Sequence, residues 1–105
     1  MFNVIFLVRK ASGMDLATFT RYWIEEHTPL TAKVPGVVGY RCYAATGAPE
    51  GEPAVEGVAI LTFADRESYE RAIAGPEFAA AIGDAPHFQD TATTTALFAD
   101  EYRIV

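Results

Sequence analysis

Cysteine and basic residues are scarce in this chain of 105 residues. Cys42 is the only cysteine, so an internal disulfide framework is excluded, and its apolar surroundings favour a buried side chain over a nucleophile. Eight Lys and Arg residues against 14 Asp and Glu residues leave a net charge of −6. This charge argues against nucleic acid and anionic membranes as partners, because both require basic surfaces. A small anionic ligand would need a local arginine, and Arg9 and Arg41 are the candidates on predicted strands.

Long apolar runs and cofactor motifs are also missing. The first run, FNVIFLV, is too short to span a bilayer and has no preceding basic region. We therefore expect no export signal, no membrane anchor and a cytoplasmic protein. No glycine-rich loop after a strand predicts a nucleotide site, so we expect no cofactor. The two histidines are far apart and no Cys-x-x-Cys pair occurs, so a metal site is also not expected.

The sequence has enough apolar residues for one compact core. Half of the chain is apolar, and we predict a single domain over residues 1–105. The segments Phe2 to Arg9 and Gly57 to Phe63 are predicted to be strands, with apolar residues at both odd and even positions. Strands of this kind are covered on both faces.

The remaining elements follow from turn and capping signals. Asp15 and Asp65 are suited to cap two helices. We expect the first helix to end near His27, because the residue before Pro29 disfavours the helical region. We also expect a strand over 37–45, an exposed loop over 46–56 and a last strand over 93–105. A second helix should begin at 65 and end at Gly75-Pro76, with Glu67 and Arg71 paired on its outer side. Further helical turns should follow over 77–82, with Phe78 and Ile82 pointing inward.

The order β-α-β-β-α-β predicts an α+β, ferredoxin-like fold with a four-stranded antiparallel sheet. Right-handed crossovers place both helices on one face of that sheet. The other face would expose more apolar surface than a monomer usually shows. We therefore predict a homodimer through the bare sheet face.

The stretch from Asp15 to Tyr40 carries the clearest functional signal. At helical spacing, one stripe contains the following residues: Leu16, Phe19, Trp23, His27 and Leu30. His27 therefore lies in the middle of an apolar face. It either has a hidden structural partner or faces an open pocket, and the spacing alone leaves both readings open.

These residues resemble the EthD-like family of dimeric α+β barrel proteins. The resemblance lies in three motifs: Phe19-x-x-Tyr22-Trp23-x-x-x-His27-x-Pro29-Leu30, then Val34-Pro35-Gly36 with Tyr40, and later Phe63-Ala64-Asp65 with Asp100-Glu101. It covers nearly the whole chain. It implies a ferredoxin-like fold, a sheet-to-sheet dimer forming a dimeric α+β barrel, and a small, mostly apolar, oxygen-bearing ligand. Activities in similar barrels range from cyclases, dehydratases and lactone isomerases to cofactor-free oxygenases.

Four residues are candidates for catalysis. His27 is suited to act as a general acid or base, since imidazole can take and give a proton near neutral pH. Tyr40 and Tyr22 could polarise a substrate oxygen, although tyrosines are also common half-buried residues. His87 lies three residues from both Asp84 and Asp90, either of which could orient its ring. An exposed loop histidine is the simpler reading of His87.

We hypothesise a cofactor-independent enzyme that acts by proton transfer on a small aromatic, polyketide-like or lactone substrate. The reaction would be an isomerisation, cyclisation or dehydration. The predicted ligand-binding residues are Phe6, Phe19, Trp23, Arg41, Phe63 and Phe78. A non-catalytic protein that binds or carries an apolar metabolite for a monooxygenase system is the alternative, and a cofactor-free oxygenase of the same fold is another.

Overall fold

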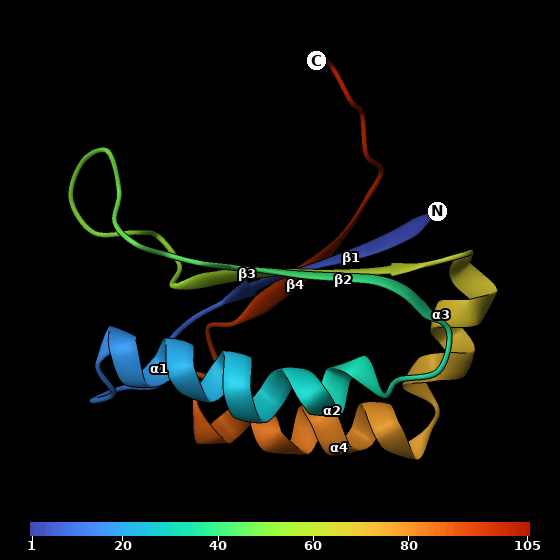
Figure 1. Cartoon of the computed structure of the whole chain (residues 1–105), viewed down its shortest axis with the longest axis horizontal. Helices are drawn as coiled ribbons and strands as arrows, with labels where there is room; N and C mark the ends of the chain where they lie inside the picture. Colours follow the sequence, from blue (N-terminus) through green and yellow to red (C-terminus); the bar gives the residue numbers. More distant parts are fainter.

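The computed structural model describes residues 1–105 as one layer of helices against one sheet (Figure 1). Its strands are β1 (Phe2–Val8), β2 (Val37–Ala44), β3 (Gly57–Phe63) and β4 (Thr95–Ala99). Its helices are α1 (Leu16–Tyr22), the π-helical turn η1 (Trp23–His27), α2 (Thr28–Ala32), α3 (Arg66–Ile73), α4 (Pro76–Asp84) and the 3₁₀ turn η2 (Ala85–His87). None of these helices is both long and apolar enough to cross a bilayer.

The sheet has the predicted ferredoxin-like arrangement. The strand order is β2-β3-β1-β4, and every neighbouring pair is antiparallel. Phe2 pairs with Phe63 and Val8 with Gly57 in the central pair. All helices lie on one side of the sheet, whereas the β2–β3 loop and the residues after β4 extend to the other side (Figure 1). The predicted α+β fold is therefore confirmed.

Both predicted helix caps are present. The Asp15 carboxylate accepts a hydrogen bond from the Thr18 backbone N–H, and Asp65 does the same with Ser68, each at 2.7 Å. These bonds satisfy amide donors that the first turn leaves without a partner. They also hold the pKa values of both carboxyls below their usual value. The two β-α connections are thus set by local side-chain chemistry.

The prediction that the first helix ends at His27 is wrong. Helical backbone continues through Pro29 to Ala32. The Thr28 N–H reaches back to the Trp23 carbonyl in a π-type bond, and the Thr28 hydroxyl donates to the Ile24 carbonyl at 2.6 Å. The wider π turn makes room for the proline ring, and the hydroxyl bonds a carbonyl in the turn where Pro29 supplies no N–H. The helix therefore extends over the sheet instead of stopping at the histidine.

Three smaller expectations also differ from the structure. The last strand is shorter than predicted, since β4 ends at Ala99. Ile82 faces the side of the cavity described below, as expected, but it is 52% exposed and is not a core residue. The outer ion pair of α3 joins Arg66 to Glu70 at 3.1 Å, one position earlier than the expected partners Glu67 and Arg71.

The core lies between the helices and one face of the sheet. It consists of two buried clusters, Val4, Val34, Leu61, Phe63 and Ala72, and Val8, Phe19, Trp23, Ala59 and Phe88. A Cβ atom at Gly57 would overlap the Trp23 ring, so glycine at the start of β3 is what lets this ring pack directly against the strand. Trp23 is therefore held at one wall of the space described next.

Candidate functional site

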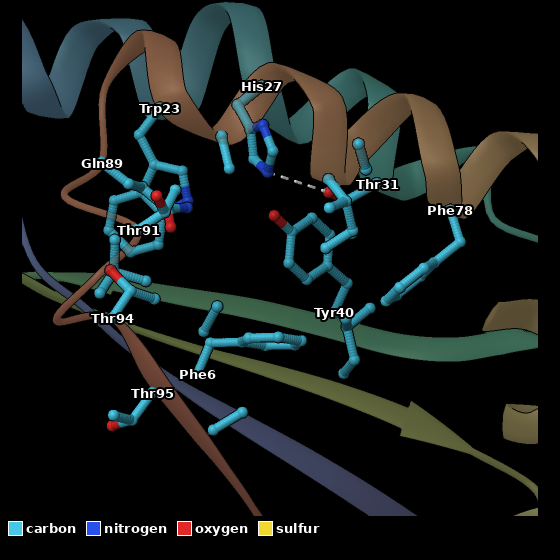
Figure 2. Close-up of a pocket in the computed structure, with 17 residues that line it drawn as sticks. Phe6, Trp23, His27, Thr31, Tyr40, Phe78, Gln89, Thr91, Thr94 and Thr95 are labelled. Atoms are coloured by element: carbon cyan, nitrogen blue, oxygen red, sulfur yellow. Dashed lines mark hydrogen bonds between the residues drawn. The ribbon is translucent and has the colours of Figure 1, made fainter.

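A cavity of about 270 Å³ lies between the helices and the sheet. Its volume is near the lower end of ligand pockets, roughly 300 to 1,000 Å³. Its lining residues are Phe6, Val8, Trp23, His27, Thr31, Tyr40, Ala59, Leu61, Phe78, Ala81, Ile82, Ala85, Gln89, Thr91, Thr94, Thr95 and Ala96. Most of these side chains are apolar, and the polar ones gather in two groups (Figure 2).

His27 is the histidine of the cavity. Only 8% of its surface is exposed, and its Nδ1 lies 2.9 Å from Asp84 Oδ2. A carboxylate can only accept, so Nδ1 carries the hydrogen and donates it. In the neutral ring, Nε2 then has a free lone pair. Figure 2 shows this nitrogen directed into the cavity, where the Thr31 hydroxyl donates to it at 3.4 Å.

Asp84 joins three side chains at the contact between the first helix and the end of α4. Besides His27, it accepts hydrogen bonds from the Tyr22 hydroxyl at 2.6 Å and from His87 Nδ1 at 3.0 Å. Burial by itself raises the pKa of Asp84, but the bonds from Tyr22, His87 and His27 outweigh it and hold the pKa below its usual value. The same carboxylate raises the pKa of Tyr22 to about 12. Asp84 is thus an anion and Tyr22 a neutral donor at neutral pH.

Tyr40 projects from β2 toward His27. Its hydroxyl lies near the His27 ring and Thr31 (Figure 2). Burial raises the pKa of the phenol well above its usual value, and the neighbouring Cys42 adds to this increase. Thr31 and Trp23 act in the opposite direction and lower the pKa. The phenol therefore stays protonated and can donate a hydrogen bond to a ligand oxygen. A base, a hydroxyl donor and an apolar body are together in one cavity.

Comparison with known proteins identifies the family. The sequence model of the EthD domain family matches residues 11–92, which is most of the chain. The chain belongs to the EthD family. No curated protein matches it in sequence.

Solved structures resemble this EthD chain over nearly its whole length. A Bacillus halodurans protein of the ethyl tert-butyl ether D (EthD) family is 26% identical, covering 97% of this chain and 99% of that one, with a TM-score of 0.83. An EthD-like protein of Ralstonia eutropha is 15% identical, with 94% and 89% covered and a TM-score of 0.73. A dimeric ferredoxin-like protein of unknown function from Thermobifida fusca is also 15% identical, with 93% and 88% covered and a TM-score of 0.71.

The predicted site residues of this EthD protein fall into three groups. Phe6, Trp23 and Phe78 line the cavity with His27 and Tyr40. Phe19 and Phe63 are fully buried in the core and do not line the cavity.

The remaining three lie outside the cavity. Tyr22 and His87 meet Asp84 behind His27, and the His87 side chain is 68% exposed. Arg41 is on the opposite face of the sheet, where it lies 3.9 Å from Glu101.

Sequence reasoning did not find the contact between Asp84 and His27. It considered Asp84 only as a neighbour of His87, three residues away. His27 and Asp84 are 57 positions apart, and only the packing of two helices on one sheet face brings them together. Thr31 was also missed, although its spacing of four from His27 places both on one helix face.

Proposed function

We propose that this EthD protein is a cofactor-independent enzyme that catalyses proton transfer on a small, oxygen-bearing organic substrate. The observation that carries the proposal is His27, whose Nδ1 is held by a buried carboxylate while Nε2 points into an apolar cavity. An orienting carboxylate fixes the tautomer of a histidine base and stabilises the imidazolium that forms. Surroundings of low polarity strengthen these interactions.

The reaction would begin with a proton on a carbon next to a substrate carbonyl. His27 Nε2 takes that proton, and the electron pair of the broken C–H bond moves into the carbonyl, which becomes an enolate. Tyr40 and Thr31 supply hydroxyl groups close enough to His27 to bind the developing oxyanion. Return of the proton to another carbon completes an isomerisation. In a cyclisation the enolate carbon attacks a second carbonyl of the substrate, and the imidazolium protonates the alkoxide that forms. In a dehydration the enolate expels a hydroxyl from the next carbon, and the imidazolium protonates this hydroxyl so that it leaves as water.

We also propose that the active form is a homodimer through the bare face of the sheet. On that face lie the half-buried residues Ile5, Leu7, Val58 and Ile60. Leu97, which pairs with Ile5, is 44% exposed. Contiguous apolar surface of this kind marks association sites. The dimeric relatives of similar fold support the same assembly.

A neutral test substrate can probe the proposed base without knowledge of the natural one. In 5-nitrobenzisoxazole, removal of the ring C–H proton by a base breaks the N–O bond and releases a coloured cyanophenolate. We expect the wild-type protein to accelerate this elimination over buffer. We expect His27→Ala to lower the acceleration about 10²-fold, the lower end of what a positioned base contributes. His27→Gln is the control that keeps a polar side chain of similar size.

Equal rates for the wild type and both variants would reject His27 as the base. Circular dichroism of each variant must show the native fold for the comparison to count. Native mass spectrometry of freshly purified protein would further reveal any retained metabolite and hence the class of the natural substrate.

A carrier that binds a metabolite without converting it is the second candidate function. One observation favours it: both ring nitrogens of His27 have hydrogen-bond partners within the chain, as in a histidine that serves packing. In that case the variants at position 27 lose affinity or stability, and no preparation accelerates proton removal. Tight binding of the retained metabolite without turnover would decide for the carrier.

A further inference from the structure

The cavity has a second polar group that the proposed mechanism does not use. Gln89, Thr91 and Thr94 line the side near Trp23, away from Thr31 and Phe78 (Figure 2). Thr95 borders the cavity at the start of β4, but it pairs with Leu7, so its side chain lies on the bare face of the sheet. Phe6 lies between this side and the Tyr40 side (Figure 2). The cavity therefore has hydrogen-bonding groups at two ends and an apolar middle.

Backbone hydrogen bonds hold this second group in place. The Asp90 N–H donates to the Arg9 carbonyl and the Ala11 N–H to the Phe88 carbonyl, each at 2.9 Å. The Thr94 hydroxyl oxygen accepts from the Arg9 N–H at 3.0 Å, so its own hydrogen remains free to donate. These bonds tie the segment after η2 to the residues after β1. The polar end is thus preformed, which lowers the entropy that a ligand must give up on binding.

Several hydrogen-bonding groups at this end have no partner within the chain. No hydrogen bond involves the side chain of Gln89 or Thr91; those of this segment use Thr94, Asp90 and Thr93. The Gln89 amide and the Thr91 hydroxyl can each donate to a ligand oxygen. The opposite end offers the Tyr40 phenol and the Thr31 and His27 side chains. Each end can therefore bind an oxygen of its own.

Fixed charge is absent from the cavity wall. None of the 17 lining residues is Lys, Arg, Asp or Glu, and the carboxylate of Asp84 is already shared among three donors behind His27. A buried carboxylate or phosphate on a ligand would lack a permanent counter-charge, which is costly in surroundings of low polarity. The wall chemistry therefore selects against anionic ligands.

From these observations we infer that the cavity takes an uncharged ligand with an apolar middle and hydrogen-bonding oxygens at two opposite ends. Gln89, Thr91 and Thr94 would be the specificity-determining residues for the second oxygen. The inference rests on the proposed function only in taking this cavity as the substrate site, and it concerns binding rather than turnover.

Three naphthalene probes of one shape test the inference by titration calorimetry. They are 2,6-dihydroxynaphthalene with two oxygens, 2-naphthol with one, and 6-hydroxy-2-naphthoate with a charge at one end. We expect the diol to bind roughly three- to tenfold more tightly than 2-naphthol, the value of one more net hydrogen bond. We expect the naphthoate to bind at least about tenfold more weakly than the diol.

A double variant locates the second contact. Gln89→Leu with Thr91→Val removes an amide and a hydroxyl at similar size, and it should abolish the preference for the diol over 2-naphthol. Thr93→Val is the matched control from the same segment, since Thr93 is exposed like Thr91 but does not line the cavity. It should keep the preference.

Each contrary result overturns the inference. These are no heat of binding with the diol, equal affinities for diol and 2-naphthol, naphthoate binding as tight as the diol, or a preference that survives in the double variant. A protein with the expected preference but no base catalysis would contradict the proposed function alone. Base catalysis dependent on His27 without the preference would contradict this inference alone.

Discussion

The two faces of the sheet have similar apolar side chains but different surroundings. On the helix side, Val4, Val8 and Leu61 are at most 4% exposed. On the bare side, Ile5, Leu7 and Ile60 are only half-buried. Because neighbouring residues of a strand point to opposite faces, the same strands supply both sets. Apolar residues in succession thus make both faces of a strand suitable for burial. The helices decide which face becomes the core with its cavity and which remains for association.

The largest expected effect tests the helix side as the source of stability. Phe19→Ala removes a fully buried ring that packs against Trp23 and Phe88. It should lower the free energy of unfolding by about 3 to 5 kcal/mol, through lost burial and the void left behind. Urea denaturation at neutral pH measures it. Ile24→Ala, at a side chain that is 43% exposed, should cost less than about 1 kcal/mol. Similar losses in both variants would contradict this picture.

The next effect tests the bare side as an interface. Ile60→Asp places a charge in the middle of the apolar surface, and a residue at the centre of an interface is worth about 2 kcal/mol or more. We expect the dissociation constant of the dimer to rise at least about thirtyfold, as measured by sedimentation, with an unchanged circular dichroism spectrum. Ile60→Val is the control that should stay dimeric. A wild-type protein that is monomeric at micromolar concentration would contradict the proposed dimer.

The smallest effect concerns the polar contact within the helix layer. Asp84→Asn should lower the free energy of unfolding by about 1 kcal/mol at pH 7, because the amide oxygen replaces the anion that binds Tyr22, His27 and His87. The native pKa of Asp84 lies below its usual value. This contribution is therefore complete above that usual value and disappears as the pH falls through the native pKa.

Urea denaturation between pH 7 and pH 2 measures the difference in the free energy of unfolding between the wild type and Asp84→Asn. This gap should narrow on acidification. The exposed residue Asp100, replaced by Asn, is the control and should show no such narrowing. A gap for Asp84→Asn that stays constant over the whole range would show that the contact contributes through packing and not through its charge.

Local signals were sufficient for most of the fold. The caps at Asp15 and Asp65 and the bounds of β3 could be predicted, because capping and strand alternation depend on residues that are close in the chain. The end of the first helix could not. The rule that a proline ends the preceding helix describes isolated α-helical backbone, and the π turn at Trp23 to His27 with the Thr28 hydroxyl bond escapes it.

The sequence by itself determined the order of the elements, the two-sided strands and the place of His27 on an apolar helix face. These depend on the period of side chains along the backbone, which any reader of the chain can count. Only the tertiary structure decided that His27 meets Asp84 and a cavity, and that Phe19 and Phe63 are core residues while Arg41 lies on the other face. The physical reason is that hydrogen-bond partners 57 positions apart are chosen by how the helices pack on the sheet, and no local pattern records that choice.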